Sequence, residues 1–178
     1  SEDHSHSWYG EAGYAFDETA WTPFVSWRCS SFGGDDPQSR DHETWDPLFY
    51  GFEDWSTGYV GEIIGNFVAL NRDLEMQTAR LRVSPVDALT LSFIYNYYRL
   101  NQPVTEIAAH DLNPRAANIR RKHLGQSFDL IADWSATENL SFTGVAAALD
   151  PGAGMQQYVE ARSGKWWLHF MLYAKLAF

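Results

Sequence analysis

Apolar residues occupy every second position of the last thirteen residues, Trp166–Phe178. A period of two predicts a β-strand with two unlike faces. A continuous apolar face that ends at an aromatic residue is typical of a strand in a bacterial outer-membrane barrel. An edge strand of a soluble sandwich would alternate in the same way. The apolar positions are Trp166, Leu168, Phe170, Leu172, Ala174, Leu176 and Phe178.

Segments with the same alternation recur along the chain and predict seven strands. Each has roughly the 9–11 residues that a tilted membrane strand needs. A membrane barrel is therefore compatible with the lengths of all of them. The predicted strands cover residues 7–16, 21–31, 73–84, 88–100, 125–135, 139–149 and 165–178.

The connections between these strands alternate between short and long. The short ones, at 17–20, 85–87 and 136–138, require antiparallel hairpins. Outer-membrane barrels have short turns on the periplasmic side and long loops outside. The pattern thus predicts one all-β domain over residues 1–178, an antiparallel transmembrane β-barrel of the bacterial outer membrane. Its extracellular loops would cover about 32–72, 101–124 and 150–164.

The number of strands is odd, whereas single-chain bacterial barrels normally have an even number. An eighth strand at 57–70 would leave a long loop on the periplasmic side. We therefore expect that the chain is the carboxyl-terminal part of a larger barrel.

Composition agrees with a barrel and excludes several other classes. The chain contains eight tryptophans and nine tyrosines, the residue types that form the aromatic girdles of membrane barrels. The mean hydropathy is −0.36, and no segment approaches the ~18 uninterrupted apolar residues of a spanning helix. A net charge of −10 argues against a nucleic-acid partner. The single cysteine, Cys29, excludes a disulfide framework.

When the apolar set of each strand is turned towards lipid, nearly all mid-strand charges fall on the opposite face. A lipid-facing Arg or Lys at mid-depth would cost about 2–4 kcal/mol. Arg99 is the exception, near a strand end where it could snorkel. The predicted pore-lining residues are Glu11, Arg28, Arg80, Arg82, Asp129, Asp133, His169 and Lys175.

Two interpretations of the four basic residues in this set remain open. They could form a basic track for an anionic solute, because arginine binds carboxylates in bidentate fashion. They could instead pair with the three inward carboxylates across the wall and merely line the pore.

The first long loop contains five carboxylates in a short stretch, and hard cations take such oxygen ligands. The stretch lacks the ordered spacing and central glycine of a calcium loop, so a solvated acidic loop is the simpler interpretation. No metal or other cofactor is predicted. The residues are Asp35, Asp36, Asp41, Glu43 and Asp46.

A basic run in the second long loop could attract lipopolysaccharide phosphates or an anionic polymer. An ordinary charged loop is the simpler explanation. The run consists of Arg115, Arg120, Arg121, Lys122 and His123.

Two motifs in the first long loop resemble the alginate export family of outer-membrane proteins. They are Ser31-Phe-Gly-Gly-Asp-Asp-Pro37 and Trp45-Asp-Pro-Leu-Phe-Tyr-Gly51. The Asn71–Arg82 segment and the Leu149–Gly152 turn are also similar to that family. The resemblance runs from about Trp8 to Phe178 but covers only the carboxyl-terminal half of a typical member. It implies a large monomeric barrel of about eighteen strands, within the bacterial size range.

No nucleophile–base pair, GxSxG elbow, phosphate loop or CxxC motif occurs, so an enzyme is not predicted. The leading hypothesis is an outer-membrane porin that passes a hydrophilic, anionic solute or a polysaccharide such as alginate. The alternatives are a structural scaffold within a larger outer-membrane assembly and a soluble glycan-binding β module. The expected partners of the channel are lipid, lipopolysaccharide, the solute, and the rest of the barrel or other envelope proteins.

The first long loop, 32–72, is expected to fold over the mouth of the pore or into its lumen. Its aromatic side chains would pack it there, since exposed aromatics on that scale are improbable. Deleting residues 40–60 should therefore raise the single-channel conductance in planar bilayers, and an unchanged conductance would contradict the gate. The aromatics are Trp45, Phe49, Tyr50, Phe52, Trp55 and Tyr59.

Overall fold

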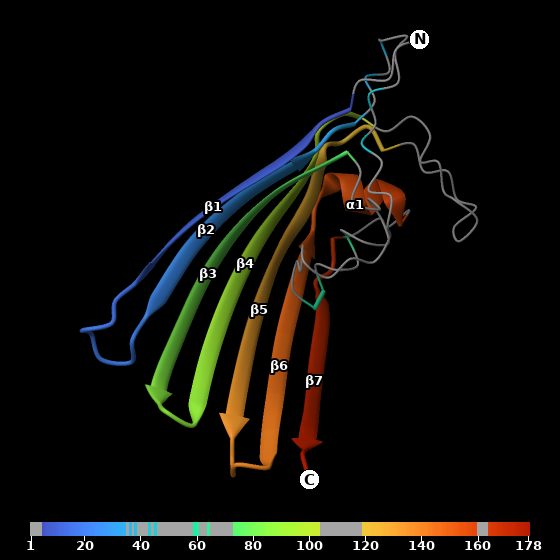
Figure 1. Cartoon of the computed structure of the whole chain (residues 1–178). Coiled ribbons are helices and arrows are strands. Elements are labelled where there is room, and N and C mark those ends of the chain that lie inside the picture. The colour runs from blue at the N-terminus through green and yellow to red at the C-terminus, as the bar shows by residue number, and fades with distance from the viewer. Residues whose placement is uncertain are drawn as a thin grey trace.

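In the computed structural model, seven antiparallel strands of the described chain lie side by side in sequence order (Figure 1). The structure describes residues 5–34, 36, 38, 43, 45, 59, 60, 64, 73–103, 119–159 and 164–178. The strands are β1 (Ser7–Ala15), β2 (Phe24–Phe32), β3 (Leu74–Val86), β4 (Leu89–Leu100), β5 (His123–Ser135), β6 (Leu140–Pro151) and β7 (Trp167–Leu176).

All seven predicted strands are confirmed, with small shifts at their ends. The first turn is longer than predicted because Trp21 and Thr22 have positive φ angles of 69° and 42°. These two residues belong to a turn closed by the Phe16 N–H, which donates to the Pro23 carbonyl over 2.8 Å. Strand β2 consequently begins at Phe24.

A short helix, α1 (Ala153–Tyr158), follows β6 and was not predicted. It has six residues and therefore too few turns to produce a helical period in the sequence. It packs mainly against β5 and buries Met155 completely. Figure 1 shows it beside the ends of the strands that carry the long connections, which we call the loop end of the sheet. The opposite end, with the short connections and Phe178, is the turn end.

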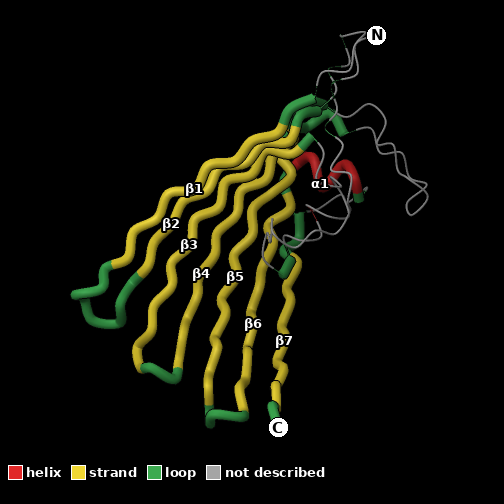
Figure 2. The backbone as a smooth tube through the Cα atoms, viewed as in Figure 1, coloured by secondary structure: helices red, strands yellow, loops and turns green. Residues whose placement is uncertain are grey.

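The sheet is open in the described residues, since β1 pairs only with β2 and β7 only with β6 (Figure 2). An antiparallel all-β architecture is thus confirmed. A closed barrel is not present within these strands.

The register assigns every strand residue to one of two faces. We call the face with Asp129 and its row the inner face, and the face with Leu130 and its row the outer face. The inner row that includes Asp129 consists of Gly13, Ser26, Arg80, Ile94, Asp129, Ala147 and His169.

The middle and turn end of the outer face are apolar and uncovered. A soluble monomer rarely leaves a contiguous apolar patch of this extent in water. We call these residues the apolar belt, and each is at least 41% exposed: Val25, Trp27, Leu81, Phe93, Leu130, Trp134, Leu168, Phe170, Leu172 and Leu176.

At the loop end the polarity of the two faces is reversed. The inner face there carries a packed apolar core, which also contains Val60, Ile64 and Ile119 from the long connections. The outer face at this level is polar, and we call its side chains the outer collar: Glu75, Gln77, Arg99, His123, Gln126 and Asp150. The strand and helix residues of the core are Phe32, Leu74, Met76, Tyr98, Leu100, Leu124, Leu149 and Met155.

A β-bulge in β5 shapes this core. The register with β4 shifts between Tyr98 and Arg99, and Gly125 at the shift has a φ of +145°. A Cβ at Gly125 would lie 2.5 Å from the Asp150 carbonyl oxygen. The extra residue, Leu124, is completely buried in the core. Bulges bend a strand and re-aim its side chains in this way.

Gly125→Ala should therefore destabilise the fold by about 1–3 kcal/mol, because alanine rarely adopts this backbone conformation. The urea midpoint of the refolded protein measures the loss. Gly144→Ala is the matched control, since the nearest atom to its added Cβ, Leu172 Cδ1, is 4.0 Å away. Equal midpoints for the two variants would contradict this account of the bulge.

Candidate functional site

The middle of the inner face is the candidate site, because it collects the charged and polar strand residues. All eight residues predicted to line a pore lie on this face by register. That they line a pore stays a prediction. Their surroundings differ, however. Some form an ion pair within the sheet, some contact the connection between β2 and β3, and some form no ion pair within the described residues.

Glu11 and Arg28 form a direct pair between β1 and β2. The two residues lie opposite each other, and Arg28 Nε and Nη2 lie 2.9 and 2.8 Å from Glu11 Oε2. The charge of Arg28 is therefore matched by a neighbour on the wall, as the pairing in the second interpretation requires; that Arg28 merely lines a pore stays a prediction.

A buried hydrogen-bond chain continues across the same row. Thr78 Oγ1 donates to Asn96 Oδ1 over 2.7 Å, and Asn96 Nδ2 donates to Ser127 Oγ over 3.2 Å. The Tyr98 hydroxyl lies 3.1 Å from the same Ser127 oxygen. This hydrogen-bond chain is not among the features predicted from the sequence, although polar residues at every second position of the three strands are its signal. Since buried polar groups need partners, the chain fixes β3, β4 and β5 to one another.

Arg80 and Arg82 differ from Arg28 because neither forms an ion pair within the described residues. They lie two residues apart on β3, about 6.6 Å along the strand. The Arg82 guanidinium carbon lies 5.2 Å from the centre of the Phe24 ring. Arg80 is half-buried and Arg82 is exposed.

The inward carboxylates that could have neutralised this pair have other partners. Asp133 Oδ1 accepts a hydrogen bond from Thr143 Oγ1 over 2.6 Å. Asp129 Oδ1 accepts one from the backbone N–H of Tyr59 over 3.2 Å. Lys175 is exposed near the turn end and has no ion pair in the described part of the chain.

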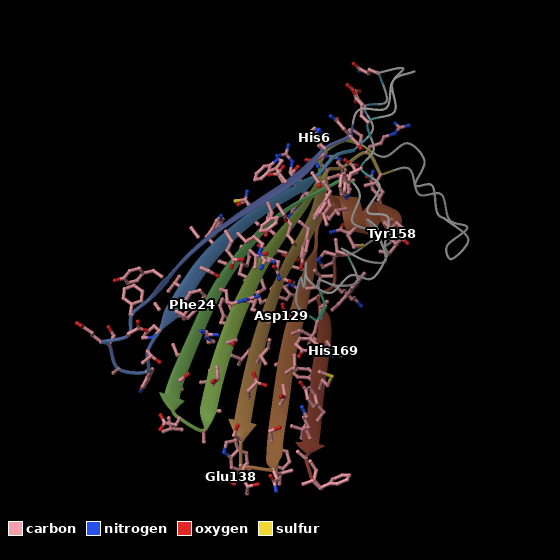
Figure 3. All side chains as sticks on the ribbon, viewed as in Figure 1. His6, Phe24, Asp129, Glu138, Tyr158 and His169 are labelled. Carbon is pink, nitrogen blue, oxygen red and sulfur yellow. The ribbon has the colours of Figure 1, made fainter. Side chains whose placement is uncertain are left out.

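Tyr59 belongs to the long connection between β2 and β3, which therefore contacts the inner face at this residue. Its ring stacks on His169 of β7, with centroids 6.4 Å apart and planes 12° apart. Figure 3 places Asp129 on β5 and His169 on β7. Asp129 has no exposed surface at all, so it contacts protein rather than solvent. Burial raises the pKa of the Tyr59 phenol above its ordinary value.

Three residues of this connection, Val60, Ile64 and Trp45, pack in or against the apolar core. Of the aromatics expected to pack the loop, Trp45 and Tyr59 do so, and the others lie outside the described residues. Those others are Phe49, Tyr50, Phe52 and Trp55.

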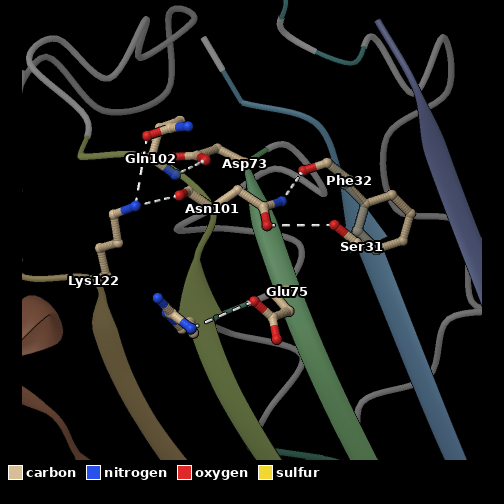
Figure 4. Close-up of polar contacts among 8 residues, drawn as sticks. Ser31, Phe32, Asp73, Glu75, Asn101, Gln102 and Lys122 are labelled. Atoms are coloured by element: carbon tan, nitrogen blue, oxygen red, sulfur yellow. Dashed lines mark hydrogen bonds and ion pairs between the residues drawn. The ribbon is translucent and has the colours of Figure 1, made fainter. Parts of the chain in front are cut away.

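A second polar network joins the loop ends of β2 to β5 (Figure 4). Asn101 Nδ2 donates to the Phe32 carbonyl over 2.6 Å, and Lys122 Nζ donates to the Asn101 carbonyl over 2.6 Å. The Gln102 N–H donates to Asp73 Oδ1 over 2.6 Å. Nearby on the outer collar, Arg99 Nη1 lies 3.8 Å from Glu75 Oε2. Arg99, the one mid-strand charge expected on the outer face, therefore has an ion-pair partner there.

The predicted basic run is partly engaged within the fold. Lys122 is part of the network just described, and the His123 ring stacks on Tyr97 with centroids 5.2 Å apart. The backbone N–H groups of Arg120 and Arg121 donate to Gln157 Oε1 over 3.1 and 2.9 Å. Arg115 lies outside the described residues. A role in binding lipopolysaccharide stays a prediction.

Two of the five acidic residues of the first long loop are described. The Asp36 N–H lies 3.3 Å from Glu43 Oε2, which accepts its hydrogen bond. Asp35, Asp41 and Asp46 lie outside the described residues. No group of three or more His, Cys, Asp or Glu side chains suited to a metal ion occurs in the part of the chain that the structure describes.

Comparison with known proteins gives the family of the chain. A family model described as alginate export matches residues 1–169. The chain belongs to the alginate export family. No curated protein matches the chain. Within the residues that the structure describes, no helix has the length and apolar character needed to cross a membrane.

Proposed function

We propose that this member of the alginate export family forms part of the wall of an outer-membrane channel for an anionic, hydrophilic solute such as alginate. The apolar belt would face lipid, and the inner face would face the transported solute. The observation that carries the proposal is the polar inner face behind an outer face suited to lipid, with Arg80 and Arg82 on it forming no ion pair within the described residues.

The height of the apolar belt supports placement in a bilayer. On β4 the outer face is apolar or aromatic from Leu89 to Tyr97, eight residues along the strand. At about 3.3 Å per residue and a tilt of about 40°, this stretch spans about 20 Å across the membrane. The apolar band of outer-membrane barrels is about 25 Å tall. Aromatic residues lie at both ends, with Trp134 near the turn end and Tyr97 next to the outer collar.

The free edges of β1 and β7 support a larger barrel. Unpaired backbone N–H and C=O groups are costly in lipid, so spanning sheets close into barrels. Further strands would therefore pair with both edges and complete a wall of which the described sheet is one part.

Arg80 and Arg82 support an anionic solute. A planar guanidinium binds a carboxylate with two parallel hydrogen bonds, and polyuronates such as alginate carry one carboxylate per sugar. Because the inner carboxylates have other partners, this pair of charges is available to a solute. Lys175 would add to it nearer the turn end.

The lipid-facing role of the apolar belt predicts a specific response to a new charge. Leu81→Arg, on the outer face of β3, should lower the free energy of unfolding in lipid vesicles by about 2–4 kcal/mol. In a soluble protein the same change at this exposed position would have little effect. Gln77→Arg, on the same face and strand but in the outer collar, is the control and should cost about 0–1 kcal/mol. Equal, small losses for both variants would contradict membrane placement.

The role of the arginines is tested by ion selectivity. Arg80→Gln with Arg82→Gln should shift the reversal potential in a salt gradient towards cation selectivity and weaken the block of current by oligouronates by about tenfold. Arg99→Gln, on the outer face, is the control and should change neither measurement. Wild-type selectivity in the double variant would contradict the solute-binding role. A protein that inserts but never conducts would favour a structural scaffold.

A further inference from the structure

The most heavily buried charged group of the inner face is Asp129, in the middle of β5. Its partners across the strands are Ile94 on β4 and Ala147 on β6, neither of which can donate a side-chain hydrogen bond. Burying a carboxylate is costly unless hydrogen bonds compensate it. Oδ2 is buried without a hydrogen-bond partner, and Oδ1 accepts the Tyr59 N–H.

Asp133, four residues further along the same strand and face, shows what an ordinary wall carboxylate does. It is exposed, and its Oδ1 accepts a hydrogen bond from Thr143 on the neighbouring strand. Asp129 instead directs its carboxylate at a backbone group 70 residues away in the sequence. The difference indicates that the Asp129 carboxylate binds the connection between β2 and β3, whereas the Asp133 carboxylate binds a neighbouring strand of the sheet.

Two further contacts fix the connection at this place. The Tyr59 ring stacks on His169, two strands from Asp129 in the same row. Ala147, which has a small side chain, lies between the two residues in that row. Val60, the next residue, is 3% exposed within the core. Apolar packing has little directionality, whereas the hydrogen bond to Asp129 defines one position of the backbone.

We propose that Asp129 is a positioning residue that holds the connection at Tyr59 and Val60 against the inner wall and thereby sets the width of the passage. The proposal rests on the channel function for its effect on conductance, but the positioning itself can be measured separately. Asp129 contacts the connection and acts on the solute only through it.

The experiment uses the full chain in lipid vesicles with Cys29→Ser and a reporter cysteine, Val60→Cys. A charged thiosulfonate reagent should label this buried reporter slowly. Asp129→Ala should accelerate labelling by about tenfold, since loss of a hydrogen bond to a charged group shifts the docking equilibrium by about this factor. Asp129→Asn has the same shape and retains an acceptor oxygen, so its labelling rate should fall between those of the parent and Asp129→Ala.

Asp133→Ala is the matched control and should leave the labelling rate unchanged. Labelling in Asp129→Ala no faster than in Asp133→Ala would overturn the proposal. If Asp129→Ala does not fold, as judged by heat-modifiable mobility on a gel, Asp129→Asn carries the test, and a rate equal to that of the parent would overturn it.

Planar-bilayer recordings separate this proposal from the channel function. A conducting parent with larger or more frequent open states in Asp129→Ala supports both. Accelerated labelling without conductance in any variant supports the positioning role and overturns the channel. If the protein conducts but Asp129→Ala leaves the labelling rate unchanged, the channel function is supported and the positioning role of Asp129 is overturned.

Discussion

The structure depends on one constraint: each strand has two faces, and the register allows no residue to change face without moving the whole strand. The outer face is apolar at Leu81 and Phe93 but polar at Gln77 and Gln126, two rows nearer the loop end. The inner face changes in the opposite direction, from Arg80 to the buried Met76. In our proposal the level at which the two faces exchange polarity marks the edge of the membrane hydrocarbon. Below it apolar side chains are best placed on the outer face against lipid, and above it they are best placed on the inner face within the protein core.

The polar inner face could form only if its groups found partners or water. Glu11 with Arg28, and Thr78 with Asn96 and Ser127, satisfy one row within the wall. The next row differs, since the Arg80 side chain forms no ion pair in the described chain and Asp129 Oδ1 accepts a hydrogen bond from the connection between β2 and β3. The polar groups that pair within the wall are thus one row of the sheet from those to which we assign a function.

The sequence predicted those features that follow from local periodicity. The seven strands and their faces depend only on alternation and turn lengths, and they were predicted to within a few residues. The bulge at Gly125 was missed, because a glycine in a strand does not reveal its φ angle. Helix α1 was missed because it is too short to show a period. The core at Met76 and Leu124 was missed because its other half comes from Val60 and Ile64, whose positions depend on contacts distant in the sequence. The partner of Asp129 was missed for the same reason.

The proposed selectivity and the proposed constriction lie at one level of the wall. Arg80 is paired with Ile94, and Ile94 with Asp129, so the arginine is two strands from the anchor of the connection, about 9.6 Å across the sheet. A solute that passes Tyr59 would therefore pass Arg80 at the same height. Placing the positive charge where the passage is narrowest strengthens its interaction with an anion, because less water screens it there. The carboxylate of Asp129 opposes this effect only from two strands away, whereas an anion in the passage could bind the Arg80 guanidinium directly with two parallel hydrogen bonds.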